Sequence, residues 1–188
     1  MSTTSDAAAT TGAYTIDPTH TRIGFVARHA MVTKVRGSFN EVEGTGRFDA
    51  TDPTQSSLSV TMQTASVDTR NSDRDAHLRT GDFFEAEAFP TITFVSTGIE
   101  AVDADAGDYR ITGDLTIKDV TKPITLDAEL SGTAVDPWGN IRMGLDGVGA
   151  ISRKDWGLTY NAALEAGGVL ISDKITLEFE VSAVRSGD

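Results

Sequence analysis

Three histidines, His20, His29 and His77, are the side chains of this sequence best suited to acid–base or metal chemistry. Zinc hydrolases combine several histidines with a carboxylate, commonly at helical or strand spacing. The histidines here have no such spacing, so a metal site would depend on contacts made only in the folded chain. The chain contains no cysteine, which excludes disulfides, thiolate catalysis and cysteine-ligated metals. We therefore expect no metal and no cofactor, and we assign no catalytic residue.

Motifs for other reaction classes are missing from the sequence as well. It contains no Gly-x-Ser-x-Gly turn, no Gly-Lys-Ser/Thr phosphate loop and no Gly-x-Gly-x-x-Gly fingerprint. With 28 acidic and 16 basic residues the formal charge is −12, which argues against nucleic acid and against docking on an anionic membrane through a basic patch. One enzymatic alternative stays open, in which a lipid-like substrate is turned over with His29 or His77 as acid or base.

Large apolar side chains are more informative, because they alternate along strands and cluster after a central polar segment. If they converge on one enclosed space, they would line a pocket for a hydrocarbon tail, where burial of one isoprene unit contributes several kcal/mol at ~0.8 kcal/mol per carbon. We include His29, which shares a strand face with Phe25; the alternative is a core histidine bonded to a backbone carbonyl. The predicted apolar pocket consists of Phe25, His29, Phe39, Leu58, Val60, Met62, Leu78, Phe83, Phe84, Phe94 and Trp156.

Three arginines, Arg70, Arg74 and Arg79, lie in the polar segment beside these apolar residues. We predict that they meet the polar or anionic head group of a ligand whose tail lies in the pocket. The alternative is a solvated helix face on which the arginines pair with Asp73 and Asp75.

The elements that would position these residues are strands of period two. They are expected from Tyr14 to His29 with a bend at Asp17-Pro18, and then at about 32–50, 57–63, 91–102, 109–117, 124–130, 141–153 and 170–184. Eight long strands joined by turns predict an all-β, antiparallel up-and-down barrel, since closure leaves no unpaired edge. Strand glycines such as Gly44 and Gly46 suggest bulges or bends. The alternatives are a two-sheet sandwich, or a barrel filled by its own side chains that acts through a protein partner.

One short helix is predicted at about 72–80, after the third strand. Ser72 and Asp75 resemble a capping box, Asp75 and Arg79 are four apart, and Gly81 is placed to end the helix in a left-handed conformation. We interpret this helix and the phenylalanines after it as the cover of one barrel end. The alternative is an ordinary crossover whose phenylalanines fill the core.

The N-terminal residues do not form the pattern of a signal peptide. Residues 1–12 have neither a basic nor an apolar leader pattern, and we interpret them as a disordered tail before a single domain at 13–188. There is no apolar run long enough to span a membrane as a helix. A cytoplasmic location is the expectation.

Several motifs resemble, in order, those of the YceI-like family. The first two groups are Ile16-Asp17 with His20, Phe25, His29 and Gly37-x-Phe39, and then Asp68-Thr69, Asn71, Arg74-Asp75, His77-Leu78, Phe83-Phe84, Pro90 and Phe94. The later groups are Gly113-x-Leu115-Thr116, Val120-Thr121-Lys122-Pro123 and Arg153 with Trp156-Gly157. The resemblance covers about residues 13–184.

This resemblance implies a lipocalin-like eight-stranded barrel that holds a polyisoprenoid chain or an isoprenoid quinone. It therefore implies a non-enzymatic binding or carrier protein for an amphipathic isoprenoid lipid, with a homodimer as a further expectation. Two departures from the family pattern are visible. Thr21 stands where a serine is commoner, and the exported location of many relatives does not transfer to a chain without a leader.

Overall fold

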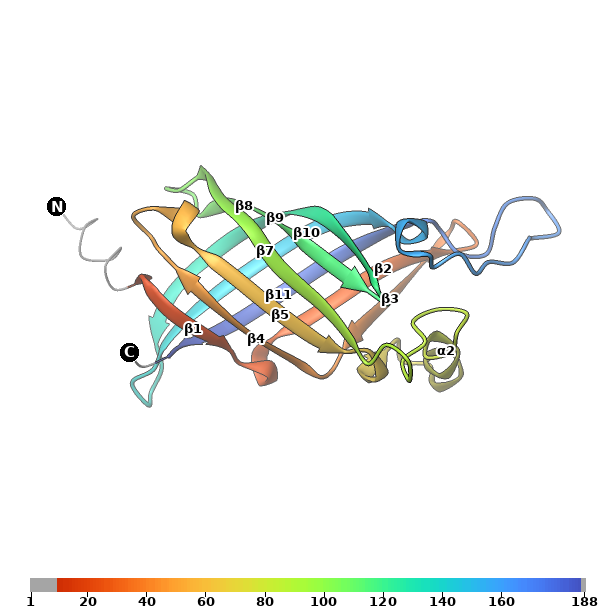
Figure 1. The fold of residues 1–188 in the computed structure, drawn as a ribbon, viewed down its shortest axis with the longest axis horizontal. Helices are drawn as coiled ribbons and strands as arrows, with labels where there is room; N and C mark the ends of the chain where they lie inside the picture. The colour runs from red at the N-terminus through yellow and green to blue at the C-terminus, as the bar shows by residue number, and fades with distance from the viewer. Residues whose placement is uncertain (1–9, 187–188) are drawn as a thin grey trace.

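Strands dominate the computed structural model, which describes residues 10–186 (Figure 1). The strands are β1 (Gly12–Ile16), β2 (Arg22–His29), β3 (Thr33–Phe39), β4 (Val42–Phe48), β5 (Ser57–Gln63), β6 (Val67–Asp68), β7 (Thr91–Asp103), β8 (Asp108–Ile117), β9 (Val120–Val135), β10 (Ile141–Ser152) and β11 (Lys174–Arg185). The helical elements are short: η1 (Pro18–His20), η2 (Pro53–Gln55), η3 (Thr64–Ser66), α2 (Ser72–Leu78) and η4 (Arg153–Trp156).

Consecutive short segments act as single long strands in three cases. β1 and β2 form one long strand, since both pair with β11. β4 pairs with β1 and β3 pairs with β2, so β3 and β4 form the second long strand. β5 pairs with β4 and β6 pairs with β3, so β5 and β6 form the third. The eleven segments of residues 10–186 therefore form eight antiparallel strands. The ring closes because Tyr14 in β1 pairs with Gly46 on one side and with Arg185 on the other. The predicted eight-stranded antiparallel barrel with one short helix is confirmed, and the two-sheet sandwich was the wrong alternative.

The first long strand is interrupted at η1, where Pro18 has no amide hydrogen to donate to a ladder. Ser182 of β11 faces this interruption. Its carbonyl accepts from the Asp17 amide at 2.8 Å and from the Thr21 hydroxyl at 3.2 Å, and its amide donates to the Thr21 hydroxyl oxygen at 3.1 Å. The Thr21 side chain thus replaces the missing backbone partner, a task for which its hydroxyl serves as a serine's would.

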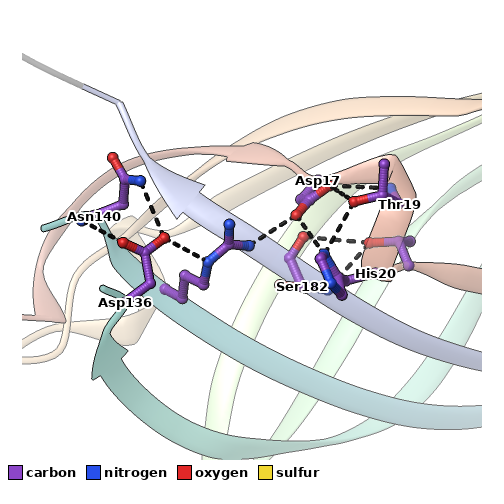
Figure 2. Close-up of polar contacts among 8 residues, drawn as sticks. Asp17, Thr19, His20, Asp136, Asn140 and Ser182 are labelled. Carbon is purple, nitrogen blue, oxygen red and sulfur yellow. Dashed lines mark hydrogen bonds and ion pairs between the residues drawn. The ribbon is translucent and has the colours of Figure 1, made fainter. Parts of the chain in front are cut away.

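A polar network links the residues beside η1 to β10 (Figure 2). Arg142 of β10 donates from Nη1 to Asp17 at 2.8 Å and from Nε to Asp136 at 2.9 Å. Hydrogen bonds from Thr19, and then from Arg142 and His20, hold the pKa of Asp17 far below its usual value. For Asp136, loss of hydration acts to raise the pKa, but hydrogen bonds, led by those from Asn140, outweigh it and lower the pKa to about 2.

Strand details differ from the sequence prediction in a few places. The last strand begins at Lys174 rather than near residue 170, because residues 158–173 form an irregular loop. Gly44 and Gly46 pair regularly with β5 and make no bulge. A Cβ on Gly44 would lie 2.6 Å from Ile16 Cδ1, so this glycine permits close packing. Register shifts occur instead at Ser96/Gly98 and Gly144/Leu145.

The helix forms where it was predicted, but its ends differ. Asn71, not Ser72, caps it by accepting a hydrogen bond from the Arg74 amide at 2.9 Å. It ends at Leu78 rather than near residue 80, and the prediction of a left-handed Gly81 was wrong, because a right-handed Arg79 forms the cap. Of the predicted N-terminal tail, residues 1–9 lie outside the described residues and Gly12 already belongs to β1.

We expect acid to weaken this fold through the two carboxylates that bind Arg142. Their pKa values are lower in the folded than in the unfolded chain, so their contribution to stability is complete above the ordinary value of 3.8 and is lost as pH falls towards the folded value, about 2 for Asp136. Urea unfolding midpoints measured from about pH 6 to about pH 2 should therefore fall less steeply for Asp136→Asn than for the wild type. Asp105→Asn, at an exposed turn, is the matched control. An unchanged slope for Asp136→Asn would contradict the assignment.

Candidate functional site

An apolar cavity of about 190 Å³ occupies the half of the barrel nearest α2. For scale, one water needs ~10–15 Å³ and an engineered apolar cavity of ~150 Å³ binds benzene. The lining of the cavity in this protein comes from most of the strands and from the segments that cover the barrel end. The lining residues are Ile23, Gly24, Phe25, Ala27, Phe39, Leu58, Val60, Met62, Leu78, Phe83, Phe84, Ile92, Phe94, Leu115, Ile117, Ile124, Leu126, Ile151, Arg153, Leu158, Ile171, Ile175, Leu177, Glu178, Phe179 and Val181.

Inward-facing glycines keep this space open. Phe25 pairs across the ladder with Gly37, and Phe179 pairs with Gly147. Each phenyl ring lies against its glycine, since a Cβ on Gly37 would be 2.4 Å from Phe25 Cζ and one on Gly147 would be 1.8 Å from Phe179 Cζ. The rings therefore lie along the wall of the barrel instead of projecting across its interior.

Two irregular segments cover this end of the barrel. One contains α2 and continues to β7; the other is the loop between η4 and β11 (Figure 1). They meet in an aromatic cluster, where the His77 ring lies 5.1 Å from that of Phe83 and 4.9 Å from that of Tyr160, and Phe83 lies 5.2 Å from Tyr160. His77 Nε2 is also 2.8 Å from Asp82. The cover is thus joined by side chains rather than by strand pairing.

Local hydrogen bonds fix the helix on the barrel. The buried Asp75 carboxylate accepts from the Thr69 amide at 2.8 Å and from the Thr69 hydroxyl at 2.6 Å. Arg74 donates to the Thr69 carbonyl at 2.8 Å, and Arg79 donates to the carbonyls of Ala65 and Val67 at 2.8 and 3.2 Å. These contacts place Leu78, Phe83 and Phe84 over the cavity.

Nine of the predicted pocket residues lie together in the cavity lining, and two do not. The nine are Phe25, Phe39, Leu58, Val60, Met62, Leu78, Phe83, Phe84 and Phe94. His29 is exposed because it is the last residue of β2. It has the same strand phase as Phe25, but it lies beyond the rim of the barrel. Trp156 is buried outside the cavity and donates from Nε1 to the Leu115 carbonyl at 3.0 Å. The structure therefore does not bring these two residues into the cavity lining.

The three predicted head-group arginines are outside the cavity lining. Arg70 is exposed with a left-handed φ of 62°, and Arg74 and Arg79 bind the backbone carbonyls that anchor α2. Neither of the latter forms an ion pair with Asp73 or Asp75 among the described residues, so the alternative in which the arginines pair with these aspartates is wrong. The role of the arginines toward a ligand head group stays a prediction. Sequence spacing placed them on the cover without showing on which side of it they lie.

The charged residues that line the cavity, Arg153 and Glu178, were not predicted. Burial lowers the pKa of Arg153, against the attraction of Asp173. Its guanidinium donates to the carbonyls of Leu158, Tyr160, Ile171 and Ser172 at 2.6 to 3.5 Å. Arg153 thereby organises the covering loop. The Arg153–Trp156–Gly157 motif contributed to the resemblance, but nothing in it revealed that these partners are backbone carbonyls.

Many aliphatic lining residues were also missed, including Ile117, Leu126 and Leu177. The signal that could have found them was the strict alternation of their strands, which we used only for the fold. In β8 this alternation appears directly as alternate buried residues from Tyr109 to Ile117.

A second cavity of about 80 Å³ lies farther along the barrel and includes Tyr14 and Tyr109. Leu58 and Val181 line both cavities. These two side chains therefore stand at the boundary between a larger compartment beneath the cover and a smaller one towards the chain termini. Loss of hydration by burial raises the pKa of both tyrosines, which favours their neutral form beside an apolar space.

Residues 10–186 contain no group of three or more His, Asp or Glu side chains arranged to hold a metal ion. In the same range no helix is both long and apolar enough to cross a membrane. The two histidines considered as acid or base, His29 and His77, do not line the main cavity.

Comparison with known proteins agrees with this geometry. A UPF0312 protein of Pectobacterium atrosepticum is 43% identical over 140 residues, which are 74% of this chain and 71% of that protein. Burkholderia cenocepacia BcnA superposes with a TM-score of 0.78 at 22% identity, over 89% of this chain and 98% of its own. A polyisoprenoid-binding domain from Saccharophagus degradans superposes with a TM-score of 0.68 at 16% identity, over 92% and 98% of the two chains.

These two structures share the barrel fold with this protein. The YceI-like domain family model matches residues 14–183, a range that contains both covering segments and all eight strands except the first two residues of β1 and the last two of β11. The protein therefore belongs to the YceI-like domain family.

Proposed function

We propose that this protein is a non-enzymatic binding or carrier protein that holds an amphipathic isoprenoid lipid, of the polyisoprenoid or isoprenoid-quinone type, inside its barrel. The observation that supports this most directly is the apolar cavity of about 190 Å³ beneath the covering segments. Each isoprene unit buried there would contribute ~4 kcal/mol, at ~0.8 kcal/mol for each of its five carbons. Affinity can therefore come from the tail alone.

Two further findings support binding over catalysis. The lining is almost entirely aliphatic and phenyl groups, and Arg153 within it is occupied by backbone carbonyls. The structural relative from Saccharophagus degradans is named a polyisoprenoid-binding domain. A homodimer and a cytoplasmic location stay predictions of the sequence.

The proposal predicts that lipid accompanies the protein purified from its own host. Native mass spectrometry should show a bound isoprenoid, and delipidated protein should take up an added isoprenoid quinone. Ala27→Trp fills the cavity from its rim and should abolish uptake, while Val148→Trp, on the exposed outer wall, should not. A wild-type chain that carries no lipid and takes up neither quinones nor polyprenyl phosphates would refute the proposal.

A second prediction concerns the glycine that accommodates Phe179. In Gly147→Ala the new Cβ forces Phe179 to rotate towards the cavity, so quinone affinity should fall ~10-fold, in line with the cost of overpacking. Gly98→Ala is the matched control, because a Cβ there meets nothing within 4 Å. Titration of both variants with the same quinone decides the matter. Equal affinities would show that the ligand does not use this part of the barrel.

A third prediction concerns tail length. Leu58→Ala removes part of the boundary between the two cavities, so long-tailed quinones should gain affinity relative to short-tailed ones. Leu145→Ala enlarges only the smaller cavity and should not change this ratio. Competition between quinones of different tail length, with folding checked by circular dichroism, measures it. A ratio unchanged in Leu58→Ala would mean that tails stop short of the boundary.

A further inference from the structure

The tip of the β2–β3 hairpin exposes apolar side chains that the turn itself does not require. Met31 is 55% exposed and Val32 is 76% exposed. Ala30 and Met31 both have left-handed backbones, with φ of 50° and 59°. Turns with positive φ at two successive residues favour Asn and Gly, so Met31 is a costly choice for the backbone as well as for the exposed surface. Neither folding nor solubility accounts for it.

The same hairpin is basic within an acidic protein. Residues 18–40 contain four of the 16 basic residues and none of the 28 acidic ones. Arg28 and Lys34 are directly opposite each other across the ladder, a placement of like charges that destabilises a sheet. Arg36 follows Lys34 on the same face. Within the described residues these three cations form no ion pair with a carboxylate, unlike Arg22, which lies 3.7 Å from Glu178.

This hairpin lies at the covered end of the barrel, next to the cavity. The Ala30 amide donates to the Leu170 carbonyl at 2.7 Å, and His29 forms a bridge with Ile171. Ile171 and Ala27 both line the cavity. Figure 1 shows the β2–β3 tip and the loop before β11 projecting from the end at which α2 lies. Val169 in that loop is also exposed, at 39%.

We propose that the β2–β3 tip docks on the surface of an anionic phospholipid bilayer. Met31 and Val32 enter the interfacial layer, while Arg28, Lys34 and Arg36 meet the anionic head groups. The overall charge of −12 does not prevent this, because charges more than ~8 Å from the membrane are largely screened at physiological salt. The net charge of the whole chain argues against such docking, and the proposal rests instead on this local run of cations.

Docking in this orientation brings the cavity end of the barrel to the bilayer. A lipid tail could then pass between the bilayer and the cavity without crossing open water. This step rests on the proposed function, whereas docking itself does not.

Co-sedimentation of the full chain with vesicles tests the docking. Binding is expected to phosphatidylcholine vesicles that contain phosphatidylglycerol, to weaken with added salt, and to be much weaker with phosphatidylcholine alone. Lys34→Gln with Arg36→Gln should lower the partition coefficient ~25-fold, since each basic residue near the surface strengthens binding ~5-fold. Met31→Ser with Val32→Ser should lower binding as well. Val135→Ser with Trp138→Ser, in the exposed β9–β10 hairpin at the opposite end, should leave it unchanged.

Tryptophan emission reports the orientation. Trp138 is 81% exposed at the opposite end and Trp156 is 3% exposed in the interior, so wild-type emission should not change on vesicle binding. Val32→Trp should show a blue shift. A blue shift of wild-type Trp138 would overturn the proposal by placing the other end on the membrane. Binding that is absent, or equally strong in the hairpin variants, would also overturn it, with an acidic protein surface then the partner to test.

Lipid uptake separates this inference from the proposed function. Quinone is supplied either in detergent or in the anionic vesicles. Uptake from detergent together with a failure to bind vesicles would refute docking and leave the binding function intact. Vesicle binding without uptake from either source would support docking and refute the lipid-binding function.

Discussion

Closure of the barrel is the constraint on which the rest of this structure depends. The ring closes only because the first long strand pairs with β4 on one side and β11 on the other. That strand is broken at η1, where Pro18 has no amide hydrogen to donate to a ladder. The Thr21 hydroxyl and the Asp17–Arg142–Asp136 network bridge the break. If the barrel did not close at this strand, the inward faces of the strands would not enclose a space.

A closed ring of eight strands does not by itself leave a cavity, because side chains can fill a barrel of this size. The interior is open here because phenyl rings lie on glycines of the neighbouring strands. Phe25 lies on Gly37 and Phe179 on Gly147. The same pairs give the wall a continuous apolar surface, so the arrangement that creates the volume also determines what it can hold.

Period-two alternation was enough to predict the number of strands, the closed architecture and most of the aromatic lining, because burial on one face of a strand is a local pattern. The failures all involve non-local geometry. His29 keeps the inward phase of Phe25 but lies beyond the rim. Arg74 and Arg79 were placed on the correct segment, yet their donors are used by backbone carbonyls of η3, β6 and Thr69. Carbonyl partners leave no trace in residue types.

An unfilled apolar cavity is costly to a protein, and this cost bears on how the barrel works. Core cavities destabilise by ~24 cal/mol per Å³, so a volume of about 190 Å³ corresponds to ~4–5 kcal/mol, against a typical total stability of ~5–15 kcal/mol. Such a cost is not needed for folding, since a larger side chain at Ala27 would fill part of the space. An apolar ligand in the cavity would offset the cost by restoring the missing contacts. The stability of the folded barrel is thereby coupled to occupancy of the cavity, which lies beneath the ring contacts of His77, Phe83 and Tyr160.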